Sequence, residues 1–280
     1  MTRNKSFDNN LLLYLIATPI GNLSEFTNRA IDVIKDMDIV ACEDTRNTQK
    51  LLSFFGIKKE LVSLHEHNEI SQSKNIIEKI KLGKKVAYVS DAGYPCVSDP
   101  GYILVKLAIE EGISCSTISG SSAFLNALVS SGLPTDHFYF HGFLSSDNSE
   151  AKKELELLVS KTETLIFYES PHRISRTLKL LHEYLGDRRA VISRELTKIN
   201  EEYVRGTLSE LSTIDESSLV GEMVIIVEGN TETNEVSDNE ILKRFDELIK
   251  LDVDKKASIE IISQEFKVNK NRIKKLILSK

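Results

Sequence analysis

Between Ser90 and Gly101 the sequence reads SDAGYPCVSDPG, and this stretch has the residue types of a ligand-binding loop. It holds two aspartates, two glycines and two prolines, and it follows the apolar run VAYV at residues 86–89. Glycine lets a backbone approach a ligand closely, and proline holds a turn rigid. The carboxylates of Asp91 and Asp99 favour a small polar or cationic ligand, because a phosphate would call for basic side chains or bare amides. A rigid connection without a ligand is the alternative.

Three other glycine-containing segments adjoin predicted strands: ATPIGN at residues 17–22, SGSSA at 119–123 and VGEMVIIVEG at 220–229. Ligands of open α/β sheets bind beyond the carboxyl ends of the strands, so we expect these segments to gather at one sheet edge. The sequence contains neither G-x-G-x-x-G nor G-x-x-x-x-G-K-[ST], so no nucleotide-phosphate loop of those types is predicted.

Short apolar runs alternate with helical patterns along the chain, which predicts an α/β fold with mostly parallel, covered sheets. Ser24 is the expected N-cap of the first helix. The predicted first-half strands are 11–17, 39–42, 86–89 and 113–118, and the helices are 45–55, 70–82, 102–111 and 121–131. A second set has strands at 138–140, 164–168, 190–193 and 220–228, with helices at 150–161 and 172–185.

Three domains are expected: residues 1–134, residues 135–230 and a small basic helical domain at 238–280, after a polar linker. The last domain is predicted to contain helices at 240–251, 257–266 and 269–278, the final two resembling a helix-turn-helix. Residues 254–280 hold eight basic and three acidic side chains, a local charge of +5 on a chain of net charge −6. This contrast indicates contact with an anionic partner through the tail.

Composition and residue spacing argue against a disulfide-rich, a metal-binding and a membrane-spanning protein. The three scattered cysteines suggest neither a disulfide framework nor a zinc site, and they fit a reducing cytoplasm. No apolar run approaches membrane-spanning length, and the run at residues 11–17 is interpreted as a buried strand rather than a signal segment. His65 and His67 flank Glu66, but this spacing lacks a third metal ligand, so no metal site is predicted.

Six motifs follow one another in the chain: TPIGNL, EDTR, SDAGYPCVSDPG, YESPHR, RELTK and GEMVIIVEG. Together they resemble the bacterial ribosomal RNA small subunit methyltransferase I family, a branch of the tetrapyrrole methylase superfamily. The motifs span residues 18–229, and the tail is similar to that family's small C-terminal helical domain. The set is specific as a whole, although any one motif alone is not.

The resemblance implies two α/β domains of tetrapyrrole-methylase type with a cofactor cleft between them, usually in a homodimer. It implies S-adenosylmethionine as methyl donor, no metal, and a cytoplasmic enzyme without a membrane partner. The implied acceptor is the 2′-hydroxyl of a cytidine ribose in the decoding region of 16S rRNA, within the 30S subunit. The cofactor-binding residues expected here are Pro19, Ser90, Asp91, Ala92, Gly93, Pro95, Val97, Ser121, Ser122, Phe143, Leu196, Gly221 and Met223.

Two positions depart from the pattern of the family. Tyr94 stands where a smaller residue, commonly threonine, is usual, and SGSSA replaces a turn of the P-G-P-S-A type. Without the proline rings, looser ligand contact is expected at Ser119 and Ser121.

Methyl transfer to a ribose hydroxyl needs in-line approach, and a base or a neighbouring cation assists it. The candidates are Glu43, Arg46, Glu195 and Lys198, with Glu43 or Glu195 as base and Lys198 as phosphate ligand or polarising group. Ion pairs that brace loops, formed by Glu43 with Arg46 and by Arg194 with Glu195, are the alternative.

Lys270, Arg272, Lys274 and Lys275 in the last predicted helix are the candidates for RNA contact, or else form the solvated face of an amphipathic helix. Two other functions compete with rRNA methylation. One is carbon methylation of a tetrapyrrole by an enzyme of the same superfamily, which would have no use for a basic tail. The other is a non-catalytic RNA-binding assembly factor.

Overall fold

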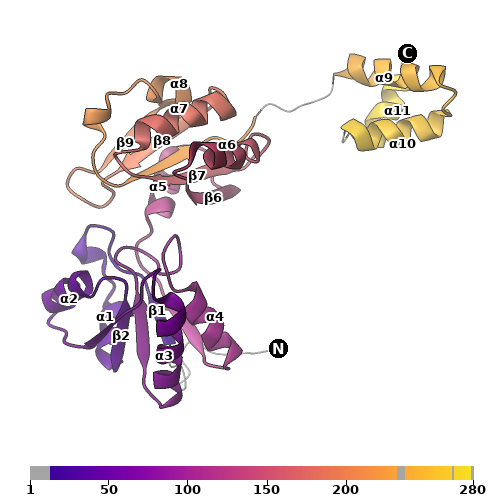
Figure 1. Ribbon diagram of the computed structural model, residues 1–280. Helices are drawn as coiled ribbons and strands as arrows, with labels where there is room; N and C mark the ends of the chain where they lie inside the picture. Colours follow the sequence, from indigo (N-terminus) through magenta and orange to yellow (C-terminus); the bar gives the residue numbers. More distant parts are fainter. Residues whose placement is uncertain (1–12, 232–236, 267, 279–280) are drawn as a thin grey trace. The chain divides into compact units, whose positions relative to one another are not determined.

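A computed structural model describes residues 13–231, 237–266 and 268–278 of the chain (Figure 1). It divides into two compact units, residues 1–230 and residues 231–280. The first unit contains two five-stranded sheets with their helices, and the second contains three helices. Within the described ranges, no helix has the length and apolar character that a bilayer crossing requires.

The first sheet is parallel throughout, with strand order β3-β2-β4-β1-β5. The apolar runs at residues 39–42 and 86–89 form interior strands with every residue buried, as predicted. The strand β3 was not predicted, because this half-exposed edge strand has no apolar run. The strands are β1 (Leu13–Ile16), β2 (Ile39–Cys42), β3 (Glu60–Ser63), β4 (Val86–Val89) and β5 (Cys115–Ile118).

Helices pack on both faces of this sheet, and apolar side chains fill the two layers between. The first helix is capped by Thr27, whose side chain accepts a hydrogen bond from the Ala30 N–H at 3.1 Å. The predicted cap, Ser24, is wrong: it lies in a short 3-10 helix (Leu23–Glu25) that Asn22 caps. Serine and threonine are both good caps, and sequence periodicity does not separate them. The helices are α1 (Asn28–Asp36), α2 (Thr45–Phe54), α3 (Glu69–Lys81) and α4 (Tyr102–Glu110).

The second sheet has strand order β6-β7-β10-β8-β9, and only β6 and β7 run parallel. The expectation of mostly parallel strands is therefore wrong for this half. The chain returns directly from β8 into β9, and β10 lies antiparallel between β7 and β8. The sequence did not predict this, because an apolar run carries no information about strand direction. The strands are β6 (Phe138–Phe143), β7 (Thr164–Glu169), β8 (Arg189–Arg194), β9 (Glu202–Thr207) and β10 (Met223–Val227).

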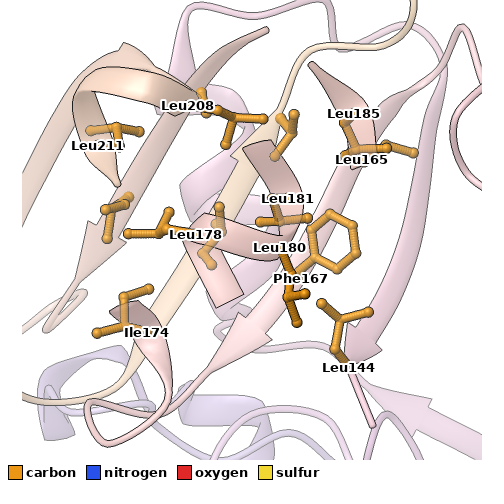
Figure 2. Packing of buried hydrophobic residues seen from close by; sticks show 14 of the residues in the cluster. Leu144, Leu165, Phe167, Ile174, Leu178, Leu180, Leu181, Leu185, Leu208 and Leu211 are labelled. Carbon is orange, nitrogen blue, oxygen red and sulfur yellow. The ribbon is translucent and has the colours of Figure 1, made fainter. Parts of the chain in front are cut away.

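The helices α6 (Asn148–Glu156), α7 (Ile174–Leu185) and α8 (Leu208–Leu211) cover one face of the second sheet. In α7 the residues Ile174, Leu178, Leu181 and Leu185 recur every three or four positions and are all buried. Figure 2 shows this stripe against Phe167 of β7. Burial of each such leucine contributes about 2 kcal/mol, so the stripe fixes α7 to the sheet.

The helix α5 (Ala123–Ser131) covers the other face of the second sheet. Its Ala127 and Leu128 pack with Ile166 of β7 and Val224 of β10. The chain thus passes from the first sheet to the second before α5. The domain boundary at residue 134 stays a prediction.

The second unit consists of α9 (Asp238–Lys250), α10 (Lys255–Phe266) and α11 (Lys270–Leu278). Ser237 and Glu240 form a reciprocal capping box at the start of α9. The core of this unit contains Ile241, Phe245, Leu248, Ile262 and Ile273.

Candidate active site

The loops that follow β1 and β4 are joined by backbone hydrogen bonds. Thr18 N–H donates to the Gly93 carbonyl at 2.9 Å, and Gly93 N–H donates to the Thr18 carbonyl at 3.1 Å. Because β1, β4 and β5 are parallel, the segments at 17–22, 90–101 and 119–123 share one sheet edge, as expected. The segment at 220–229 instead leads into β10 of the second sheet, so its placement on the same edge was wrong.

The far end of the 90–101 loop is fixed to the first sheet. Gly101 has φ +119°, and a Cβ added there would lie 2.2 Å from Cε1 of Tyr88. The Tyr88 hydroxyl donates to the Pro100 carbonyl at 2.8 Å. Glu69 caps α4 by accepting from the N–H groups of Gly101 and Ile103 at 2.8 and 3.0 Å. Only glycine fits at position 101, and the loop is held at both ends.

The Asp91 carboxylate is oriented by residues at the start of α2. It accepts from the Asp44 backbone N–H at 3.2 Å and from the Asn47 side-chain amide at 2.9 Å. These donors leave Asp91 on the outer side of the loop, where it is exposed. The loop therefore presents a preoriented negative charge.

The loops of the first sheet and the strand ends of the second enclose a cavity of about 360 Å³, a size typical of small-molecule sites. Four carboxylates line it, and none of its described lining residues is basic. Such a lining favours a ligand with positive charge over a phosphate. The cavity residues are Ile20, Asp91, Ala92, Gly93, Tyr94, Val97, Ser98, Asp99, Ser122, Ala123, Phe124, Phe143, Tyr168, Glu169, Ser170, Pro171, Leu196, Glu222, Met223 and Val224.

Asp99 is a cavity carboxyl whose pKa is raised. Burial raises its pKa to about 6, and the negative charges of Glu43 and Asp91 act in the same direction. A hydrogen bond with Ser90 opposes them in part. A carboxyl of this kind titrates near neutral pH and responds to a cation bound nearby.

One wall of the cavity is apolar and comes largely from the second sheet. Phe143 is half exposed and packs edge-on against Tyr168, with ring centroids 5.5 Å apart. Met223 and Leu196 line the cavity beside them. Phe143 is therefore a wall residue, and Tyr168 both packs against the α5 layer and faces the cavity.

Glu169 and Arg173 of the YESPHR motif form a structural clamp at the edge of the cavity. The Glu169 side chain is fully buried and accepts from Ser170 N–H at 2.8 Å and from the Thr177 hydroxyl. Arg173 Nε lies 3.4 Å from Glu169 Oε1, and its Nη2 donates to the Leu144 carbonyl. The pair thus ties the β7–α7 turn to the segment after β6.

The two departures from the family pattern meet each other in the structure. The Tyr94 hydroxyl accepts a hydrogen bond from the Gly120 N–H at 3.2 Å, inside the SGSSA turn. The Ser121 hydroxyl donates to Glu25 Oε2 at 2.6 Å. Tyr94 is long enough to hold a turn that lacks proline rings, so the turn is restrained by hydrogen bonds instead.

Glu195, Lys198 and Glu222 form an ion cluster beside the cavity. Lys198 Nζ lies 3.0 Å from Glu195 Oε1 and 3.3 Å from Glu222 Oε2. Burial alone would lower the pKa of Lys198, but hydrogen bonds and charge from both glutamates together raise it. Lys198 is consequently an ammonium donor at neutral pH rather than a base. A Cβ added at Gly21 would lie 2.6 Å from Lys198 Cγ, so Lys198 also packs on the loop after β1.

Glu43 and Arg46 lie on the first sheet's side, at the start of α2, and neither lines the cavity. Burial raises the pKa of Glu43, and the nearby charge of Asp91 adds to this. The Arg46 side chain is 85% exposed and paired with Asp44 at 2.7 Å. The four predicted catalytic residues therefore fall into two groups, one on each sheet's loops.

Eight of the predicted cofactor-binding residues line the cavity: Asp91, Ala92, Gly93, Val97, Ser122, Phe143, Leu196 and Met223. Pro19 and Ser90 line a neighbouring pocket, and Ser121 lines a depression that includes Glu25. Pro95 is buried, and Gly221 contacts Glu195, so neither is a wall residue. Their roles stay predictions.

Sequence reasoning placed Asp99 in the ligand-binding loop but missed other wall residues, notably Ile20 and Glu222. Each lies inside a motif that was singled out, so proximity to a motif was the available signal. Within the described ranges, no group of three or more histidine, cysteine, aspartate or glutamate residues is arranged to hold a metal ion.

Comparison with known proteins gives the following similarities. The family model of tetrapyrrole (corrin/porphyrin) methylases matches residues 12–212. A Bacillus subtilis protein named ribosomal RNA small subunit methyltransferase I is 48% identical over 82% of this chain and 78% of that protein. A Haemophilus influenzae protein of the same name is 39% identical over 94% of each chain.

Solved structures share the fold at low sequence identity. The methyltransferase CobJ superposes with a TM-score of 0.60 at 18% identity, over 81% of this chain and 97% of that one. Diphthine synthase gives a TM-score of 0.60 at 18% identity, over 79% and 90% of the two chains. The two-sheet architecture is thus the tetrapyrrole-methylase fold.

Proposed function

Because this chain belongs to the tetrapyrrole methylase family, and within it to the ribosomal RNA small subunit methyltransferase I proteins, we propose that it transfers a methyl group from S-adenosylmethionine to ribosomal RNA. The specific acceptor we propose is the ribose 2′-hydroxyl of a cytidine in the decoding region of 16S rRNA. The substrate would be the 30S subunit in the cytoplasm, and the enzyme a homodimer.

The cavity is the observation that carries the cofactor part of this proposal. S-adenosylmethionine supplies, when bound, an electrophilic methyl group on a sulfonium cation. Asp91 and Asp99 offer that cation negative charge, and the described wall offers no competing basic side chain. Phe143, Tyr168 and Met223 provide an apolar surface for an adenosine ring. The residues present therefore fit this cofactor better than a phosphate-rich one.

The residues beside the cavity suit a hydroxyl acceptor. Lys198 is held as an ammonium between two carboxylates, so it stabilises developing negative charge on an oxygen or binds an RNA phosphate. Glu43 has a raised pKa and is therefore a better proton acceptor than an ordinary carboxylate. We propose that Glu195 positions Lys198 and that Glu43, which lies outside the cavity wall but close to the charge of Asp91, takes the proton of a hydroxyl seated on that side of Asp91.

The test is tritium transfer from labelled S-adenosylmethionine to 30S subunits of a strain that lacks the endogenous family enzyme. The RNA is digested and the labelled nucleoside identified. We expect label in 2′-O-methylcytidine, and we expect Asp91→Ala to abolish it together with cofactor binding measured by calorimetry.

Asp32→Ala removes an equally exposed carboxylate on α1 and is the matched control, with full labelling expected. Cofactor binding without labelled RNA would refute the rRNA reaction and direct the assay to tetrapyrroles. Failure to bind the cofactor at millimolar concentration would instead support a non-catalytic RNA-binding protein.

A further inference from the structure

A second pocket of about 320 Å³ lies beside the cavity, and besides the predicted cofactor residues Pro19 and Ser90 it is lined by residues of α2 that the cofactor prediction does not include. Its wall comes from the loop after β1, from α2 and from the start of the 90–101 loop. Asp91 lines both the pocket and the cavity, so the two are adjacent. A group seated in this pocket would therefore lie next to a cofactor seated in the cavity.

The helix α2 presents one face to this pocket. Asn47, Lys50 and Phe54 are three and four residues apart, so they align along the helix, and all three line the pocket. Phe54 is 66% exposed and packs only by its edge on Phe55, with centroids 5.0 Å apart. Leu23 lies across from it and is also exposed. An aromatic ring exposed to solvent beside a pocket is unusual, because large apolar side chains are usually buried.

The pocket's polar groups suit a nucleotide. Lys50 is exposed, and none of the described carboxylates forms an ion pair with it. Asn47 is held by its hydrogen bond to Asp91, which leaves the amide oxygen as an acceptor. On the side of Gly21, the pocket adjoins Lys198, which packs directly on that residue. A stacking ring, a mobile cation and a fixed amide are the groups with which proteins hold an unstacked base and its phosphate.

We propose that this pocket receives the acceptor nucleotide of the RNA, with its base stacked on Phe54 and its phosphate held by Lys50. This inference rests on the proposed function, because it assigns the acceptor of the same reaction. A base withdrawn from its neighbours is stabilised by a new stacking partner, and Phe54 supplies one next to the wall that Asp91 shares with the cavity.

The test compares wild type, Phe54→Ala, Phe54→Trp and Leu82→Ala. Leu82 is the control, because it is a similarly exposed apolar side chain at the end of α3. Three quantities are measured for each: KM for 30S subunits, Kd for 30S subunits by filter binding, and Kd for S-adenosylmethionine by calorimetry. Phe54 is exposed, so its truncation leaves the core intact.

We expect Phe54→Ala to raise KM and Kd for 30S subunits roughly tenfold, the loss typical of one base–aromatic stack. Phe54→Trp restores both values, Leu82→Ala matches wild type, and cofactor affinity is unchanged throughout. The tryptophan rescue separates stacking from a general structural role.

If the Phe54→Ala variant methylates RNA with the KM and Kd of the wild type, the inference is overturned and the proposed function stands. Weakened cofactor binding in that variant also overturns it, because Phe54 would then belong to the cofactor site. A wild type that binds 30S subunits without methylating them refutes the proposed function, and the Kd of Phe54→Ala still decides whether the pocket holds RNA.

Discussion

Asp99 shows how burial changes the behaviour of a single carboxyl. Its pKa of about 6 lies above the usual value, chiefly because the loop and the cavity wall remove it from water. The folded protein thus holds this proton more tightly than the unfolded chain. The free energy of unfolding therefore contains a contribution from Asp99 that falls as the pH rises from about 4 to about 6 and is constant above that range.

The same titration predicts a pH dependence of cofactor binding. A sulfonium cation favours ionised Asp99, so we expect affinity for S-adenosylmethionine to rise roughly three- to tenfold between pH 5 and pH 7. S-adenosylhomocysteine has an uncharged sulfur and should show a smaller rise. Calorimetry at several pH values measures both ligands on the wild type and on Asp99→Asn.

Asp99→Asn should bind S-adenosylmethionine with little dependence on pH across this range. A slope as steep as that of the wild type would exclude Asp99 as its source. The asparagine keeps the shape of the side chain, so a loss of folding is not expected to obscure the comparison.

At the scale of elements, the turn between β8 and β9 depends on backbone conformations that sequence patterns do not reveal. Glu195 and Thr197 have φ of +51° and +69°, and Thr197 N–H donates to Glu201 Oε2 at 2.6 Å. Gly221 has φ +86°, and a Cβ added there would lie 2.1 Å from Glu195 Oε1. Because Gly221 has no side chain, the Glu195 side chain has space to reach Lys198.

We expect Gly221→Ala to displace Glu195 and to lower kcat for methyl transfer at least tenfold, because Lys198 loses its fixed position. Gly83→Ala is the matched control: its φ is +87°, and no heavy atom lies within 4 Å of the added Cβ. Both variants should lose about 1 kcal/mol of stability from the φ alone. Thermal unfolding and labelled-methyl assays measure the two effects, and equal kcat in the two variants would remove Glu195 from the mechanism.

The elements that sequence predicts best are those whose burial is nearly complete. The strands at residues 39–42 and 86–89 and the stripe along α7 follow directly from apolar spacing. The missed strands β3 and β9 are both edge strands in which no residue is fully buried, so the apolar signal is weak.

The candidate site was predicted less completely than the fold. Motifs located the loops and the carboxylates of Asp91 and Asp99, but the pairing of Lys198 with Glu222 depends on a contact between segments distant in sequence. The meeting of Tyr94 with Gly120 is of the same kind. Such contacts follow only once the strands of each sheet have brought their loops together.

At the scale of the whole molecule, two basic residues of α11 in the second unit form ion pairs with acidic residues of the same unit. Lys270 pairs with Glu260 at 2.6 Å, and Arg272 pairs with Asp238 at 2.8 Å, both within the unit. Lys274 and Lys275 lie one turn further along α11. This unit lies outside residues 12–212, the range of the family model, so its role is proposed from charge.

We propose that the second unit binds rRNA phosphates. Replacing Lys270, Arg272, Lys274 and Lys275 with glutamine should weaken binding to 30S subunits and flatten the plot of log K against log salt. The slope should fall by less than about 0.9 for each residue, because Glu260 and Asp238 already offset two of the charges. Lys243→Gln on α9 is the control, and an unaltered slope in the quadruple variant would exclude the tail as a phosphate clamp.

Because α5 precedes residue 134 but packs on the second sheet, it limits where the chain can be cut into parts that fold independently. A cut at residue 134 falls where sequence composition invites it, yet it would separate Ala127 and Leu128 from the sheet they cover and leave both fragments with bare apolar faces. A fragment that ends at residue 134 is therefore not expected to fold independently of the rest of the compact unit that ends at residue 230.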